Sequence, residues 1–152
     1  MGDYRVLVTG SRDWEDVPAI HRVLDTLLAE HGTLTLVHGA CRTGADKIAH
    51  DWGLERYYAT SYGAVIVDPH PADWRPDGVF DKSAGFKRNA AMVALGADLC
   101  LCFLMPCSDS RCRIAVEHGS HGASHCADLA EKAGIPVRRY GPRRGDNLLT
   151  GL

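Results

Sequence analysis

The chain has 152 residues, of which 45% are hydrophobic and 24% are charged, and its formal net charge is -2. This length suits a single domain, and the composition excludes a chain that is disordered throughout. The near balance of opposite charges argues against a general polyanion binder. No apolar run approaches the roughly 20 residues of a membrane helix, and the first residues do not resemble a signal peptide, so we expect a cytoplasmic protein with no membrane partner.

Short apolar runs rich in β-branched residues alternate with segments of helical periodicity. The runs predict strands at residues 5–9, 33–37, 64–67 and 98–104, and a fifth strand that begins at residue 135. The periodic segments predict helices at residues 17–32, 45–52, 83–96 and 123–134. This alternation predicts an α/β fold, a five-stranded parallel sheet with helices on both faces. We expect one domain over residues 1–140, with an irregular insert at 105–121, and a flexible basic tail over 141–152.

In such folds ligands bind beyond the carboxyl ends of the strands, so the segment that follows the first strand is a candidate site. Gly10 permits a sharp turn, and Ser11 and Arg12 can contact a phosphate. Trp14 offers a ring to stack on a base. The alternative is a plain strand-to-helix turn in which Arg12 pairs with Asp13.

The segment after the second strand has two glycines, Gly39 and Gly44, on either side of Arg42 and directly before a helix. Backbone N–H groups at a helix start favour an anion, and the arginine adds charge, so we favour a phosphate site here. Asp46 is a candidate to accept hydrogen bonds from ribose hydroxyls. The alternative is that Asp46 only favours the helix start and Arg42 is solvated.

Two further polar segments follow along the chain. Asp73 and Trp74, in a proline-rich loop after the third strand, are candidates to contact a ribose or base, although Trp74 can equally well cover an edge of the core. Arg88 and Asn89 lie in the first turns of the next helix, where a basic residue is unfavourable unless an anion is near. The alternative for this basic turn is pairing with Asp81 or Asp98.

The last predicted helix begins after a segment of glycines, serines and histidines at residues 118–125. Gly119, Ser120 and Gly122 would let a phosphate approach backbone N–H groups, and His121 can add a side-chain contact. A flexible glycine turn explains the same composition.

In this order the motifs resemble the SLOG superfamily, which includes the DNA-processing Smf proteins and the Lonely Guy enzymes, and in particular its small YspA-like branch. The matching pieces are VTGSRDW at 8–14, HGACRTGAD at 38–46, PADW at 71–74, AGFKRNAAM at 84–92, GAD at 96–98 and AGIPV at 133–137. The resemblance implies a Rossmann-like sheet and a site for a nucleotide or a nucleotide-derived, ADP-ribose-like ligand. Because related proteins often form dimers, it also implies a homo-oligomer.

Lonely Guy enzymes are phosphoribohydrolases, which cleave the bond between base and ribose phosphate. Arg88 matches their arginine, but their catalytic glutamate falls on Cys126, and a neutral thiol does not supply the carboxylate that an oxocarbenium-like transition state needs. We therefore expect a sensor or binding module for a nucleotide-like ligand. The alternatives are a phosphoribohydrolase acting on nucleoside monophosphates, with Asp46, Asp73 or Glu117 supplying the carboxylate, and a DNA-associated processing protein. The DNA-processing members of the superfamily and the one basic cluster, at 138–144, favour a nucleic-acid partner, and the net charge argues against one.

Six cysteines in a chain expected to be cytoplasmic indicate thiols or metal ligands rather than disulfides. The insert and the start of the last helix carry a spacing that suits a structural zinc ion. The expected ligands are Cys107, Cys112, His118 and one of His121, His125 or Cys126, with Cys126 the first choice. The alternative is reduced cysteines on a solvated loop, with Cys126 on a buried helix face. Cys100 and Cys102 lie two residues apart on a strand and are expected in the core.

Overall fold

The computed structural model describes residues 3–59, 64–114 and 119–142, and every structural statement below concerns these residues. The strands are β1 (Tyr4–Gly10), β2 (Leu34–His38), β3 (Val65–Pro69), β4 (Leu99–Phe103) and β5 (Val137–Tyr140). The helices are α1 (Val17–His31), α2 (Gly44–Ala59), α3 (Ala84–Ala94) and α4 (His121–Lys132), with a single 3-10 turn, η1 (Pro76–Gly78). None of these helices is both long and apolar enough to cross a membrane.

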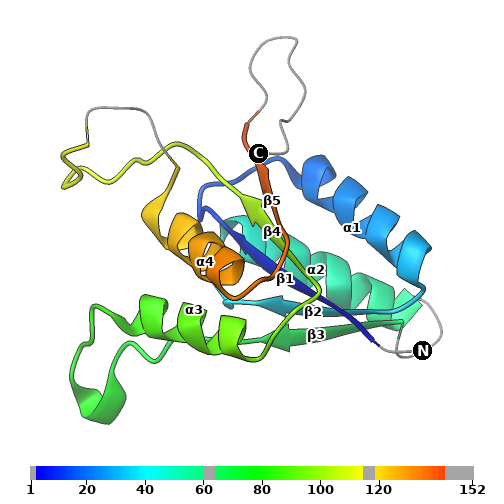
Figure 1. Ribbon diagram of the computed structural model, residues 1–152, viewed down its shortest axis with the longest axis horizontal. Helices are drawn as coiled ribbons and strands as arrows, with labels where there is room; N and C mark the ends of the chain where they lie inside the picture. The colour runs from blue at the N-terminus through cyan, green and yellow to red at the C-terminus, as the bar shows by residue number, and fades with distance from the viewer. Residues whose placement is uncertain (1–2, 60–63, 115–118, 143–152) are drawn as a thin grey trace.

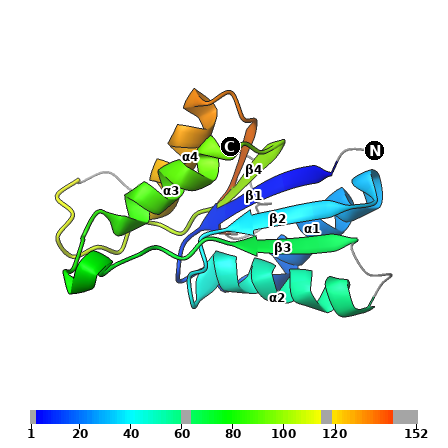
Figure 2. The ribbon, with the colours of Figure 1, turned by 90° about the horizontal axis from the view of Figure 1, so that it is seen from below.

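The strands form one parallel sheet in the order β3-β2-β1-β4-β5 (Figure 1). The chain winds outward from β1 to β3 and then returns to place β4 against the other side of β1. Helices α1 and α2 cover one face of the sheet, and α3 and α4 cover the other (Figure 2). The predicted five-stranded parallel α/β sheet with helices on both faces is therefore confirmed, and the order reverses between β1 and β4, where such folds open a ligand crevice.

The three central strands are buried because helices pack on both of their faces. All five residues of β2 and of β4 are buried, which is the continuous apolar pattern expected of such strands. Trp52 and Leu24 pack on one face, while Met92 and Cys126 pack on the other. Cys100 and Cys102 are fully buried, so their predicted place in the core is confirmed.

The element boundaries differ from the predicted ones mainly around α4. The helix begins at His121 rather than near residue 123, within the segment expected to be irregular. Strand β5 begins at Val137, two residues later than expected, because Pro136 has no N–H to give to a ladder. The insert between β4 and α4 is irregular over its described residues apart from one bridge, between Pro106 and Gly119. Most of the expected basic tail, residues 143–152, lies outside the described residues.

Trp14 belongs to the core, contrary to the expectation that it stacks on a ligand. Its side chain is 3% exposed, and its ring meets Phe103 edge-on with 5.4 Å between centroids. Its indole N–H donates to the carbonyl of Asp16 at 3.0 Å. The ring thus packs in the core and its N–H group has a partner within the protein, so neither face is available to stack on a base.

This placement predicts different effects for two tryptophan substitutions. Trp14→Ala should lower the free energy of unfolding by about 3–5 kcal/mol, because it empties a closely packed site. Trp74→Ala, at a residue that is 38% exposed, should cost less than about 1 kcal/mol. Urea unfolding followed by far-ultraviolet circular dichroism measures both, and equal losses would contradict the assignment of Trp14 to the core.

Candidate functional site

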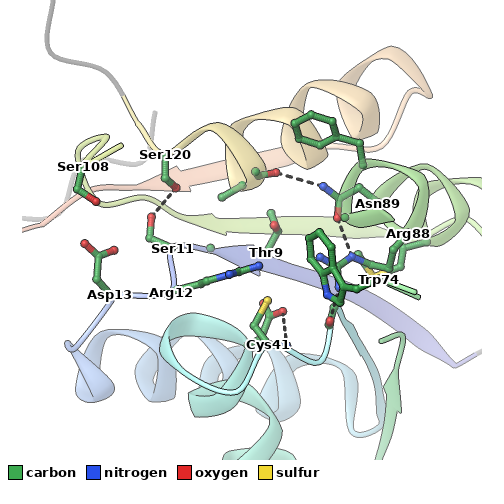
Figure 3. A pocket seen from close by; sticks show the side chains of 18 of the residues that line it. Thr9, Ser11, Arg12, Asp13, Cys41, Trp74, Arg88, Asn89, Ser108 and Ser120 are labelled. Carbon is green, nitrogen blue, oxygen red and sulfur yellow. Dashed lines mark hydrogen bonds between the residues drawn. The ribbon is translucent and has the colours of Figure 1, made fainter. Parts of the chain in front are cut away.

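A cavity of about 500 Å³ lies beyond the carboxyl ends of β1 and β4 and is bounded by the beginnings of α3 and α4 (Figure 3). The predicted site residues that line it are Gly10, Ser11, Arg12, Gly39, Asp46, Trp74, Arg88, Asn89, Ser120 and Gly122. Residues that line it and were not predicted are Thr9, Asp13, Cys41, Lys82, Gly85, Phe86, Met92, Ser108 and Ala123. Its charged lining comprises three cationic side chains, of Arg12, Lys82 and Arg88, and two acidic ones, of Asp13 and Asp46.

Helical spacing could have identified part of the missed set. Gly85 and Met92 lie three residues before and four residues after Arg88, and Phe86 lies three before Asn89, so all of them share one face of α3. Ser108, by contrast, lies in an irregular loop, and no periodicity points to it.

Ser11 joins three parts of the cavity floor. Its hydroxyl accepts the N–H of Met105 at 2.8 Å, so its own proton is available to Ser120, whose hydroxyl oxygen lies 2.7 Å away. Its backbone N–H donates to the carbonyl of Phe103 at 2.8 Å. These bonds fasten the loop after β1 to the end of β4 and to the start of α4.

Glycines bring the loops after β1 and β2 into close contact. A Cβ atom at Gly10 would lie 2.4 Å from the Cβ of Ala45, and one at Gly44 would lie 2.2 Å from the carbonyl oxygen of Ser11. Gly44 also has φ 74°, a conformation that side chains disfavour. Gly44 therefore packs two loops together and does not line the cavity.

Arg42 also lies outside the cavity. Its side chain is exposed and lines a separate hollow of about 290 Å³ with His38 and His50. In the same loop Gly39 lines the cavity, and Cys41 lines both the cavity and this hollow.

Arg88 is held in the cavity wall by a set of oxygen acceptors. Its Nη1 donates to the carbonyl of Gly39 and, at 3.3 Å, to that of His70, while its Nε donates to Oδ1 of Asn89 at 2.9 Å. A Cβ atom at Gly39 would lie 2.6 Å from Nη1 of Arg88, so only glycine leaves room for the guanidinium. The alternative pairing with Asp81 belongs to Lys87, whose Nζ lies 2.6 Å from that carboxylate.

Asn89 connects α3 to the start of α4. Its side chain is 4% exposed and donates to the carbonyl of Gly122 at 3.2 Å while its oxygen accepts from Arg88. One buried amide thus orients the arginine and fixes the distance between the two helices. Asp98, the other proposed partner of the basic turn, accepts from the backbone of Arg5 at 2.8 Å.

Asp46 is a carboxyl group that is 4% exposed in the wall near Arg88. Burial raises its pKa, and hydrogen bonds from Cys41 partly oppose that effect. Burial and the neighbouring Asp46 in turn raise the pKa of the Cys41 thiol, so this thiol is protonated at neutral pH. Cys126 at the family's glutamate position is fully buried, and burial raises its pKa to about 11, so it supplies no negative charge.

Aromatic rings stand at the mouth of the cavity. Trp74 lies against Gly85 and stacks on Phe80 with 6.2 Å between centroids, and the guanidinium of Arg12 is 6.0 Å from its ring centroid. Phe86 is 48% exposed.

Asp73, the neighbour of Trp74, lines a second hollow of about 440 Å³, which shares Arg88 with the first.

The start of α4 faces the cavity. Ser120 is its N-cap residue, but its hydroxyl bonds Ser11 and caps no N–H group of the helix. Gly122 and Ala123 of the first turn line the cavity, so the positive end of the helix dipole points into it. Gly119 lies against Leu104, outside the cavity lining.

The expected metal ligands separate into two groups. Cys107 and Cys112 lie beside His121, whereas Cys126 is buried in the core on the sheet-facing side of α4. His118 lies outside the described residues.

A buried histidine supports the loop after β2. His38 is 2% exposed, and its Nδ1 accepts the N–H of Ala40 at 3.0 Å, so Nε2 carries the ring proton and donates to Nδ1 of His50 at 2.9 Å. Ala40 has φ 57°, a strained conformation for alanine, and the bond to His38 holds it. Burial, followed by the charge of His50, lowers the pKa of His38 to about 4.

Comparisons with known proteins match nearly the whole chain. A family model described as the YspA, cpYpsA-related SLOG family matches residues 4–76, from β1 to η1. The chain is 39% identical over 142 residues to the Gene 61 protein of Mycobacterium phage D29, an alignment that covers 91% of this chain and 98% of that protein. The second match extends past the family model, over the part of the chain that carries α3 and α4.

The buried state of His38 predicts a pH dependence of stability. Its pKa of about 4 in the folded protein lies below the ordinary value of 6.5, so between these values the unfolded chain binds a proton that the folded protein does not. Lowering the pH from 7 to 4.5 should therefore cost about 2 kcal/mol through this group. Urea unfolding at both values should show this loss in the wild type and not in His38→Gln, and equal losses in the two proteins would contradict it.

Proposed function

The chain belongs to the YspA, cpYpsA-related SLOG family, and on this basis we propose that it binds a nucleotide or a nucleotide-derived, ADP-ribose-like ligand in the cavity beyond β1 and β4. Membership of this family suggests nucleotide-related binding or processing. The observation that carries the proposal is the guanidinium of Arg88, fixed in the cavity wall by neutral acceptors while the positive end of α4 faces the same space.

The phosphates of such a ligand belong at the polar side of the cavity. The Arg88 guanidinium donates its hydrogen bonds to neutral carbonyl oxygens, which orient it without neutralising its charge, so the cation keeps its attraction for an anion. Gly122 and Ala123 bring uncapped helix N–H groups to the same space. A phosphate between these groups would meet two independent sources of positive potential.

The base belongs at the mouth of the cavity, and the ribose belongs deeper, beside the wall that carries Asp46. The ring of Trp74 is partly exposed, and Phe86 adds apolar surface from α3. Asp46 offers a buried carboxyl group to ribose hydroxyls. A volume of about 500 Å³ lies within the roughly 300–1,000 Å³ usual for small-molecule sites, which suits a ligand of nucleotide size.

A second candidate is hydrolysis of the base–ribose bond of nucleoside monophosphates. The observation that favours it is Asp46, an acidic side chain in the same wall as Arg88, where Cys126 supplies no carboxyl group. Free base released from AMP, and abolished by Asp46→Asn, would support hydrolysis. Binding without release of base from a purine and pyrimidine panel would exclude it.

A DNA-associated role has less support. Arg139, in the basic stretch that favoured it, pairs with Asp128 at 3.0 Å and with Glu131, so carboxylates already compensate its charge. Affinity for nucleic acid depends on cations free to meet phosphates.

The proposal predicts distinct effects for two arginines. Arg88→Ala should weaken binding of ADP-ribose, measured by isothermal titration calorimetry, by roughly 10–100-fold, because a charge-assisted hydrogen bond contributes about 1.5–3 kcal/mol. Arg88→Lys, which keeps the charge but not the fixed donors, should lie between. Arg42→Ala, an arginine of the neighbouring loop outside the cavity, is the matched control and should bind as the wild type does.

Two results would contradict this prediction. The first is equal weakening by Arg42→Ala and Arg88→Ala, which would indicate a general charge effect. The second is the absence of any heat or thermal shift for the wild type with AMP, ADP and ADP-ribose at millimolar concentration.

A further inference from the structure

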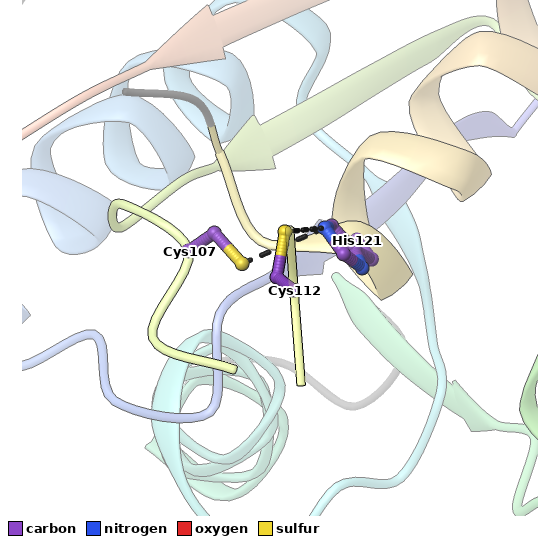
Figure 4. A group of neighbouring side chains, drawn as sticks. All are labelled: Cys107, Cys112 and His121. Atoms are coloured by element: carbon purple, nitrogen blue, oxygen red, sulfur yellow. Dashed lines mark hydrogen bonds between the residues drawn. The ribbon is translucent and has the colours of Figure 1, made fainter. Parts of the chain in front are cut away.

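Three potential metal ligands converge in the loop between β4 and α4. Cys107 and Cys112 come from the loop, and His121 is the first residue of α4 (Figure 4). Each sulfur lies 3.5 Å from Nε2 of His121, and the three atoms all lie within 4.8 Å of one another. Cys107 and His121 are 14 positions apart in the sequence, and the described residues between them, 108–114 and 119–120, form no helix or strand.

The backbone of the loop explains why these side chains meet. Pro106 forms a bridge with Gly119, and Met105 accepts the N–H of Ser120 at 3.1 Å, so the residue after the bridge, Cys107, lies beside the start of α4. A turn at Asp109, whose carbonyl accepts the N–H of Cys112 at 3.0 Å, brings the chain back. These backbone contacts bring the three side chains to one place.

We propose that Cys107, Cys112 and His121 bind one Zn²⁺ ion. Thiolate sulfur and imidazole nitrogen are the ligands zinc prefers, and four residues between the cysteines is a spacing found in zinc sites. With Zn–S of about 2.3 Å and Zn–N of about 2.0–2.1 Å, tetrahedral angles place sulfur and nitrogen about 3.6 Å apart. The separations of 3.5 Å match this geometry.

Binding leaves the net charge of the site unchanged. Each thiol loses its proton to solvent as its sulfur coordinates the ion, and the two thiolates balance the charge of Zn²⁺. His121 binds as the neutral imidazole through Nε2. These ligands leave one tetrahedral position for a water molecule or another donor.

The ion would fix one wall of the cavity. It would tie the loop of residues 107–112 to the first residue of α4, and Ser108 of that loop lines the cavity together with Ser120 and Gly122 on either side of His121. Zinc here takes the place of an apolar core, because residues 107–114 contribute little buried hydrophobic surface, and Ile114 among them is 61% exposed.

Neither of the other described candidates joins this group. Cys126 faces the core, and His125 lies with its Nδ1 3.4 Å from the amide nitrogen of Asn89 and its ring 4.3 Å from that of Phe86. Of the three alternatives predicted for the remaining ligand, the structure brings His121 to Cys107 and Cys112 and not the first choice, Cys126, because the first turn of α4 turns His121 toward the loop.

Cobalt titration of the full chain tests the site. Protein reduced and freed of metal by a chelator should bind one equivalent of Co²⁺, with the intense thiolate-to-cobalt absorption in the near ultraviolet and the visible bands of a tetrahedral ion, and Zn²⁺ should displace it. Cys107→Ser, Cys112→Ser and His121→Gln should each weaken binding by at least about 100-fold, more than the roughly 10–100-fold effect of removing a hydrogen-bond partner of a ligand. Cys41→Ser and His125→Gln, near the cavity but outside the ligand set, should keep the wild-type spectrum.

Circular dichroism of each variant shows whether it is folded, and hydrogen exchange gives a readout that does not depend on spectra. Zn²⁺ should slow amide exchange in residues 105–114 of the wild type and not of His121→Gln. The proposal is overturned if the wild type gives no thiolate–cobalt absorption, or if the control variants lose it to the same extent.

Discussion

The guanidinium of Arg88 sets the geometry on which the candidate site depends. A cation in a partly buried wall needs oxygen acceptors, and Arg88 takes them from the ends of two strands and from its neighbour Asn89. The hydrogen bonds of Arg88 hold α3 against the loops after β2 and β3, and Asn89 in turn holds the start of α4 through its bond to Gly122. The cavity is the space left between these elements.

The same requirement explains local features that otherwise have no reason. Gly39 has no side chain because the guanidinium occupies that volume. His38 stays neutral and supports the strained backbone at Ala40, which turns the carbonyl of Gly39 and the N–H of Cys41 into place. On the opposite side, the Ser11–Ser120 bond and the ligands of the proposed zinc ion fasten the start of α4. Polar contacts thus hold the loops on both sides of the cavity in place.

The sequence predicts the architecture well because burial on both faces leaves an unbroken apolar pattern. Strand β4, with every residue buried, and the helical spacing in α1 are the best examples. Arg88 is recognisable since a basic residue at a helix start opposes the helix dipole. The directions of the Trp14 and Arg42 side chains could not be predicted from the sequence. A residue just after a strand can point toward the core, the solvent or the cavity, and only the packing of the neighbouring loop decides among them. The choice between Cys126 and His121 as metal ligand likewise depended on where α4 begins, which composition in a glycine-rich segment does not determine.

The most direct test of the account is a titration of ¹⁵N-labelled protein with ADP-ribose, followed by NMR. The account predicts saturable shifts of the backbone amides of Ser11, Gly122 and Ala123 and of the Nε signal of Arg88, with small changes at Arg42. Saturation that shifts only residues away from the cavity, or no shift of these signals at millimolar ligand, would contradict it.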